Sequence, residues 1–261
     1  MFVYDFRLEA GDLNAGTVYL PDDNTSGAPV IIYCHGWGGK RQLSATTRVL
    51  CDKAIEAGIA LVTFDFYARG DTGGDFRSMT YERWKNNLSD VVTWVSSQPF
   101  SDIERIGCYA FSSGSTAAFR VAAEDERIAF IISVGTCVSA HFAMERGGPA
   151  KLLADNLDKL TSGGTVKIYG TRFGIDFFID TISNAPINLM HKIKCPVLFL
   201  QGAADNTFRC SDAKNAYDLL AMRNPNNGTA YIPLEGGTHA LDNMADEAMA
   251  KAIGWLTAII K

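Results

Sequence analysis

The chain has 261 residues, 47% hydrophobic and 20% charged, a balance typical of a globular protein with one α/β domain or two small ones. Its 24 basic and 29 acidic side chains give a formal net charge of −5, which argues against a nucleic acid partner because nucleic acids are bound mainly through clustered Lys and Arg. Charged residues interrupt the apolar start of the chain and no apolar segment is long enough to cross a membrane, so we expect a cytoplasmic protein without a membrane partner.

The six cysteines are scattered along the chain without the spacing of a metal site or a redox motif. Several lie inside apolar runs, where a free thiol behaves as a small hydrophobic side chain. We therefore expect free thiols. A disulfide between Cys34 and Cys108, which fall in neighbouring predicted strands, is the alternative.

Strands and helices alternate along most of the chain. An opening antiparallel hairpin is predicted from the patterns at 2–9 and 16–20. Further strands are expected at 29–34, 59–66, 106–110, 127–134, 196–200 and 229–233, and helices at 44–57, 81–97, 115–123, 211–222 and 245–260. This alternation predicts an α/β fold with a mostly parallel central sheet and helices on both of its faces.

The alternation stops after the sixth predicted strand. Short helical pieces, a glycine pair and several aromatic residues follow instead of clean strands. We therefore divide the chain into a core domain, residues 1–136 and 193–261, and a helical cap insertion, residues 137–192. The aromatic residues Phe142, Phe173 and Phe177 are candidates for a substrate pocket, and packing of the insertion onto the core is the alternative role for them.

A serine follows the apolar run IGCYA at the predicted turn from strand to helix. Such a turn exposes a serine hydroxyl and tolerates only small residues two positions before and after it. Ala110 and Gly114 satisfy this demand for Ser112, whereas centring the turn on Ser113 would place Phe111 at a crowded position. Ser112 is therefore the candidate nucleophile. An ordinary helix N-cap is the alternative.

The strand at 29–34 runs directly into the sequence HGWGG at 35–39. Glycines at this position let backbone amides point at a ligand or at a developing oxyanion. A nucleotide site is a weak alternative because neither GxGxxG nor a phosphate-loop Lys-Ser/Thr pair is present, and a plain turn is the other. We expect His35 to hold this loop by hydrogen bonding, and we include it among the substrate-pocket candidates.

An acidic residue and a histidine follow two later strands. Asp205 comes after PVLFL, and His239 comes after the strand at 229–233. Because ligands gather at the carboxyl ends of parallel strands, both side chains are expected at the same edge as the candidate serine. Serine, acid and histidine in this chain order are typical of a catalytic triad on such a sheet. Asp212 and Asp180 are the alternative acids.

Four motifs resemble those of the α/β-hydrolase superfamily: HGWGG at 35–39, AFSSG at 110–114, GAAD at 202–205 and GGTH at 236–239. The resemblance covers essentially the whole chain. Within the superfamily the chain is most similar to small bacterial esterases of the cinnamoyl or feruloyl type, through HG at 35–36, the segment at 64–76 and the run PVLFLQGAAD. Those esterases commonly have Gly-His-Ser-Gln-Gly-Gly at the serine turn, whereas this chain has Ala-Phe-Ser-Ser-Gly-Ser.

The resemblance implies an α/β-hydrolase fold and a serine esterase that cleaves carboxylic esters of small to medium acyl or aryl acids. His239, oriented by Asp205, would take the proton from Ser112, and the backbone amides of Trp37 and Ser113 would form the oxyanion hole. Neither a metal nor an organic cofactor is required. A thioesterase, lactonase or peptidase with the same triad is the alternative, followed by a non-catalytic ligand-binding protein. We expect a small-molecule ester as the substrate and leave a homodimer open.

Overall fold

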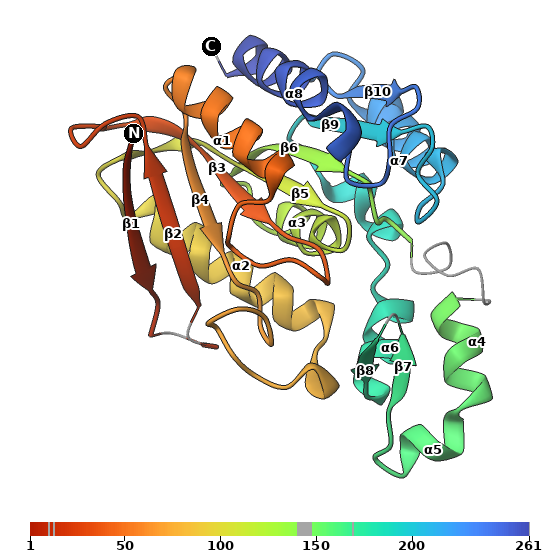
Figure 1. The fold of residues 1–261 in the computed structure, drawn as a ribbon. Helices are drawn as coiled ribbons and strands as arrows, with labels where there is room; N and C mark the ends of the chain where they lie inside the picture. The colour runs from red at the N-terminus through yellow and green to blue at the C-terminus, as the bar shows by residue number, and fades with distance from the viewer. Residues whose placement is uncertain (10, 13, 140–147, 169, 261) are drawn as a thin grey trace.

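An eight-stranded sheet forms the centre of the computed structural model, which describes residues 1–9, 11–12, 14–139, 148–168 and 170–260 (Figure 1). Its strands are β1 (Phe2–Arg7), β2 (Ala15–Leu20), β3 (Ala28–Cys34), β4 (Ala60–Phe64), β5 (Ser101–Phe111), β6 (Ile128–Val134), β9 (Val197–Gly202) and β10 (Ala230–Leu234). Their spatial order is β1-β2-β4-β3-β5-β6-β9-β10. β2 is antiparallel to both of its neighbours, and every neighbouring pair from β4 to β10 is parallel. The predicted mostly parallel sheet is confirmed.

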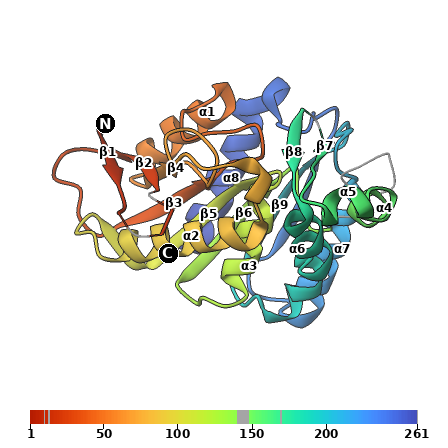
Figure 2. The ribbon, with the colours of Figure 1, turned by 90° about the horizontal axis from the view of Figure 1, so that it is seen from below.

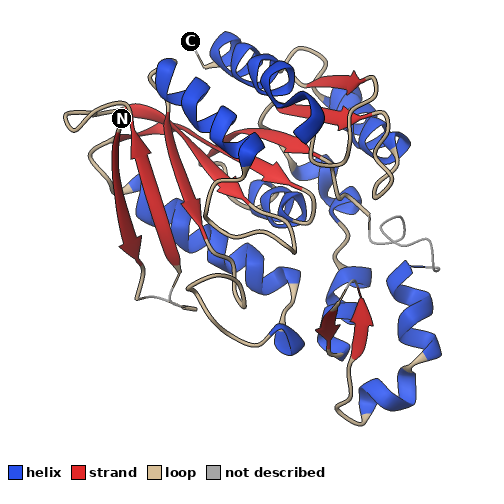
Figure 3. Cartoon of the chain, viewed as in Figure 1, coloured by secondary structure: helices blue, strands red, loops and turns tan. Residues whose placement is uncertain are grey.

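Helices cover both faces of this sheet (Figures 2 and 3). The helices of one face are α1 (Ala45–Glu56) and α8 (Ala245–Ile259), and those of the other are α2 (Tyr81–Ser96), α3 (Gly114–Ala122) and α7 (Cys210–Arg223). Alternate residues of each central strand pack on opposite layers, so that in β3 Ile32 faces the α2 side and Ile31 the α1 side. Burial on both faces explains why these strands are continuous apolar runs in the sequence.

Further elements lie between β6 and β9, outside the large sheet. They are α4 (Gly148–Asp155), α5 (Leu157–Thr161), β7 (Val166–Ile168), β8 (Thr171–Phe173), α6 (Ile175–Ser183) and the 3₁₀ helix η2 (Pro186–Lys192). Figure 1 shows them as a group beside the sheet. β7 and β8 pair antiparallel, which corrects the expectation of helical pieces alone. Each strand has three residues, too few for an alternating pattern to be recognised.

A buried ion pair joins α6 to the core. The Arg120 guanidinium on α3 lies 2.9 Å from the carboxylate of Asp180 on α6, and the two side chains are 2% and 9% exposed. The same carboxylate accepts hydrogen bonds from the backbone amides of Tyr81, at 2.7 Å, and Glu82, at 3.2 Å, at the start of α2. Asp180 therefore compensates both a buried cation and the positive end of a helix.

Replacing Asp180 with alanine is expected to lower the free energy of unfolding by about 3–5 kcal/mol, because it leaves the Arg120 charge buried and unpaired. Urea unfolding measures this loss. Asp218 is the control, since it pairs with Lys214 on the exposed surface of α7, and its replacement with alanine should cost less than about 1 kcal/mol. Equal losses for the two variants would contradict the anchoring role of Asp180.

All six cysteines are free in the structure, including Cys34 and Cys108, which are both buried. None of the helices within the described residues combines the length and the apolar character that a membrane crossing requires.

Candidate active site

Ser112 lies between the end of β5 and the start of α3. Its φ angle of +54° is in the left-handed region, which is uncommon for a residue other than glycine and concentrates at functional sites. The turn is closely packed: a Cβ atom on Gly114 would lie 2.2 Å from the carbonyl oxygen of Cys34, and one on Gly36 would lie 3.0 Å from the Cβ of Ser112. The first contact explains why the turn requires glycine two residues after the serine, and the second shows how closely the loop after β3 approaches it.

The loops that follow β9 and β10 bring an acid and an imidazole to this serine. The Nε2 atom of His239 lies 3.0 Å from the Oγ of Ser112. Its Nδ1 atom lies 2.9 Å from the Oδ2 of Asp205. Because a carboxylate can only accept, Nδ1 carries the proton and Nε2 is free to accept the serine proton. The structure therefore brings together all three predicted triad residues, each from the carboxyl end of a different strand.

Two glycines, Gly135 and Gly202, allow this approach. A Cβ atom on Gly135, which directly follows β6, would lie 2.7 Å from the Cε1 of His239. A Cβ atom on Gly202, at the end of β9, would lie 2.3 Å from the carbonyl oxygen of Gly237. Gly202 begins the GAAD motif, but both contacts join segments far apart in the sequence, so no local pattern could have revealed the contacts themselves.

The carboxylate of Asp205 is fully buried, and hydrogen bonds compensate the cost of burying its charge. Oδ2 accepts a hydrogen bond from Gln201 Nε2 at 2.7 Å as well as the one from His239. Oδ1 accepts from the amides of Thr207, at 2.7 Å, and Phe208, at 3.0 Å. Burial acts to raise the pKa of Asp205, but the hydrogen bond and charge of His239 and the two backbone amides outweigh it and hold the pKa below its usual range. The group therefore stays ionised and can stabilise a positive charge on the imidazole.

The alternative acids are placed elsewhere. Asp212 lies in the first turn of α7, where burial raises the pKa of its carboxyl group. Its Oδ2 atom is buried without a hydrogen-bond partner among the described residues. Asp180 is engaged by Arg120, as described above. Among these three acids, Asp205 is the one in contact with His239.

Two backbone amides are candidates for the oxyanion hole: that of Ser113, the residue after the candidate serine, and that of Trp37, in the loop after β3. Both residues line the same cavity as Ser112. Neither amide has a hydrogen-bond partner among the described residues. Ser113 is the N-cap of α3, where the unpaired amides of a helix favour negative charge. The two amides are thus free to donate to an oxyanion.

His35 holds the loop that carries Trp37. Its Nδ1 donates to the carbonyl oxygen of Gly36 at 2.8 Å, and its Nε2 accepts from the amide of Phe66 at 3.1 Å. Only a neutral imidazole can make both bonds. Complete burial lowers the pKa of His35 to about 4. The ring is fully enclosed and does not line the cavity. His35 is therefore a support of this loop, and its assignment to the substrate pocket is corrected.

This lowered pKa predicts an acid-dependent loss of stability. Between pH 6.5 and about 4, the unfolded chain protonates His35 while the folded chain does not. Stability is therefore lost as the pH falls through this window. Between pH 7 and pH 4, the unfolding free energy should drop by about 3 kcal/mol more in the wild type than in His35→Asn. Urea unfolding at both pH values tests this, with the exposed His191→Asn as control. Equal drops in wild type and His35→Asn would contradict a buried neutral imidazole.

Comparison with known families adds an independent line of evidence. The family model described as X-Pro dipeptidyl-peptidase (S15 family) matches residues 11–162, more than half of the 261-residue chain. The chain belongs to the S15 family. Peptidases are hydrolases, so the predicted hydrolase class is confirmed. This S15-family chain is also 25% identical over 256 residues to an uncharacterised 31.7 kDa protein from the traX-finO intergenic region of Escherichia coli, covering 85% of the chain and 87% of that relative.

Solved structures confirm the fold of this S15-family chain. Est1E from Butyrivibrio proteoclasticus, solved with ferulic acid bound, superposes with a TM-score of 0.80 at 17% identity, covering 95% of this chain and 96% of Est1E. The esterase Pf2001 from Pyrococcus furiosus superposes with a TM-score of 0.76 at 20% identity, covering 100% and 91% of the two chains. The predicted α/β-hydrolase fold is therefore confirmed.

The loop at 35–39 of this S15-family chain has a second support that the sequence analysis missed. Asp65, fully buried just after β4, accepts hydrogen bonds from both the amide and the guanidinium of Arg41, each at 2.7 Å. Asp71 pairs with the same guanidinium at 2.6 Å. These bonds join the segment after β3 to the segment after β4. The glycine-rich run at 64–76 was the available signal, because such a run permits close approach of the backbone.

The cavity at Ser112 has a volume of about 440 Å³. Phe173 and Phe177 were predicted to line it, but both are fully buried and lie outside its lining. Their rings pack against Trp37 with centroid distances of 5.1 and 5.6 Å, so they support the indole rather than contact a ligand. This corrects their assignment. Phe142 lies outside the described residues.

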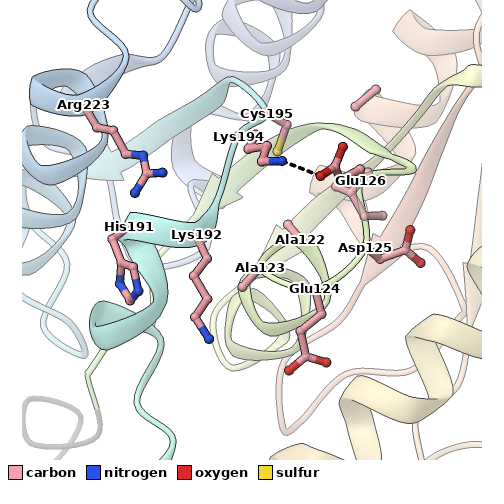
Figure 4. Close-up of a pocket in the computed structure, with 12 residues that line it drawn as sticks. Ala122, Ala123, Glu124, Asp125, Glu126, His191, Lys192, Lys194, Cys195 and Arg223 are labelled. Carbon is pink, nitrogen blue, oxygen red and sulfur yellow. Dashed lines mark hydrogen bonds and ion pairs between the residues drawn. The ribbon is translucent and has the colours of Figure 1, made fainter.

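A second cavity, of about 530 Å³, lies at the other end of α3 (Figure 4). It is lined by Ala122 and Ala123, whereas Ser112 precedes the start of that helix. Figure 4 shows charged side chains around it, with Lys194 and Glu126 forming an ion pair. The cavity therefore lies at the opposite edge of the sheet from the triad.

Proposed function

We propose that this chain is a serine hydrolase that cleaves carboxylic esters of small to medium acyl or aryl acids through an acyl-enzyme intermediate. One observation carries the proposal: an unbroken hydrogen-bond chain runs from Ser112 through His239 to the buried Asp205, with distances of 3.0 and 2.9 Å. Its serine end opens into a cavity that also presents two backbone amides, those of Trp37 and Ser113, which have no partner in the described parts of the chain. This is the arrangement that acyl transfer requires.

The reaction has two halves. The Oγ of Ser112 attacks the ester carbonyl while Nε2 of His239 takes its proton, and the Asp205 carboxylate stabilises the resulting imidazolium. The carbonyl oxygen, now negatively charged, accepts hydrogen bonds from the amides of Trp37 and Ser113. Collapse of this intermediate breaks the bond to the alcohol, which leaves with the proton from His239. In the second half, His239 deprotonates a water that attacks the acyl group, and the acid is released as Ser112 regains its proton.

Dipeptidyl-peptidase activity is the second candidate, because the matching family is described by that activity. Such an enzyme must bind the free ammonium group at the end of a peptide, and a buried ammonium needs an anionic partner. No Asp or Glu side chain is among the described residues that line the catalytic cavity. This lining favours uncharged substrates, and the ferulic acid bound to Est1E supports an aryl acyl group.

A panel of substrates tests the proposal. p-Nitrophenyl butyrate and ethyl ferulate represent esters, butyryl-CoA represents thioesters, and Gly-Pro-p-nitroanilide represents the dipeptidyl-peptidase reaction. We expect kcat/KM to be highest for the esters and the anilide to be inert. Turnover of the anilide alone would replace the proposal with dipeptidyl-peptidase activity, and turnover of the thioester alone would replace it with thioesterase activity.

A further inference from the structure

Two tyrosines lie side by side in the catalytic cavity and have no role in the reaction described above. Tyr33 on β3 and Tyr109 on β5 are direct partners in the parallel register, with ring centroids 5.9 Å apart. Both point to the face covered by α1 and line the cavity that contains Ser112. Their side chains are 5% and 2% exposed.

The hydroxyl groups of both tyrosines lack hydrogen-bond partners within the described parts of the chain. Other tyrosines differ in this respect: the hydroxyl of Tyr231 donates to the carbonyl oxygen of Cys210 at 3.4 Å, and that of Tyr67 bonds Ser78 at 2.9 Å. Neither oxygen is among the fully buried side-chain atoms without a partner, so both hydroxyls are accessible from the cavity, where a ligand can bond to them. Burial raises the pKa of Tyr33 and of Tyr109, so both remain protonated and able to donate.

A third hydroxyl lines the same cavity. Thr46 lies in the first turn of α1, the helix that covers this face, and it lines the cavity while being only 6% exposed. Its hydroxyl likewise has no partner within the described parts of the chain. We call Tyr33, Tyr109 and Thr46 the hydroxyl cluster. Because no described Lys, Arg, Asp or Glu side chain lines this cavity, the cluster suits an uncharged oxygen rather than an ion.

We propose that the hydroxyl cluster selects esters whose apolar body carries a neutral oxygen substituent, such as a phenol, an alcohol or a ketone. This inference rests on the proposed esterase function and specifies its substrate class. A site built to hydrogen-bond a substrate oxygen rejects the hydrocarbon analogue, because binding that analogue leaves the buried hydroxyls unpaired. We expect a preference of about 10- to 100-fold for the oxygen-bearing member of a matched pair.

Two matched pairs test this selection, one for each side of the ester bond. The acyl pair is the p-nitrophenyl esters of 3-phenylpropanoic acid and 3-(4-hydroxyphenyl)propanoic acid. The alcohol pair is benzyl acetate and 4-hydroxybenzyl acetate. The wild type should show a ratio of kcat/KM values of at least about 10 in one of the two pairs. A ratio near one in both pairs would overturn the proposal.

The double variant Tyr33→Phe/Tyr109→Phe removes the two hydroxyls and keeps both rings. Its ratio should fall towards one. The variant Tyr231→Phe removes a tyrosine hydroxyl outside the cavity, at the sheet edge, and should keep the wild-type ratio. Urea unfolding of both variants checks that they are folded. A double variant that is folded and retains the wild-type ratio would show that these hydroxyls do not select the substrate.

A binding measurement separates this inference from the proposed function. In Ser112→Ala, calorimetry gives the Kd of methyl 3-(4-hydroxyphenyl)propanoate and of its unsubstituted analogue without turnover, and the same measurement is made for the benzyl acetates. A tighter Kd for the phenol in either pair, lost on adding Tyr33→Phe/Tyr109→Phe, supports the cluster even if the wild type hydrolyses no ester. Equal Kd values within both pairs contradict the cluster even if the wild type is an active esterase.

Discussion

Replacing Ser112 with alanine is expected to lower the kcat for p-nitrophenyl butyrate by about 10⁶-fold. The substitution removes the attacking oxygen, whereas the amides that face the cavity and the pair of His239 with Asp205 remain. Steady-state kinetics with an initial-rate assay measure the loss. The control is Ser96→Ala on α2. The Ser96 hydroxyl donates to the Val92 carbonyl of its own helix, and this variant should keep wild-type kcat. A loss smaller than about 100-fold for Ser112→Ala would mean that another group attacks the ester.

Replacing Asp205 with asparagine is expected to lower kcat by about 10⁴-fold. The amide is uncharged, so it cannot stabilise the imidazolium, and its NH₂ group can force His239 into the wrong tautomer. The matched control is Asp212→Asn, because Asp212 is a buried acid near the same strand end that does not contact the imidazole. Its kcat should stay within about threefold of wild type, because His239 is paired with Asp205 and not with Asp212. A comparable loss in both variants would contradict the assignment of Asp205.

The elements of the site that follow strand ends could be predicted from the sequence. Ser112 and Asp205 follow the apolar strands β5 and β9, His239 follows the edge strand β10 within a few residues, and parallel strands carry such positions to one edge. The close packing at Gly114 is reflected in the local pattern of small residues around the serine. These inferences needed only local sequence and the direction of the strands.

The lining of the cavity could not be predicted in the same way. Phe173 and Phe177 are aromatic residues of the kind that line ligand pockets, but they pack against Trp37 instead. This contact depends on how the segment after β6 packs on the core. In the sequence, Tyr33 and Tyr109 are ordinary members of two apolar runs that predict strands. Only the sheet register places their rings side by side. Tertiary contacts over long sequence separations decide both cases.

Covalent labelling tests the central claim most directly. The wild-type enzyme is treated with a fluorophosphonate, digested, and mapped by mass spectrometry of its peptides. The hydrogen-bond chain from Ser112 to Asp205 predicts one phosphonyl adduct, on Ser112, and no adduct in Ser112→Ala. An adduct on a different residue, or an unlabelled wild-type enzyme, would contradict the role of Ser112 as the nucleophile.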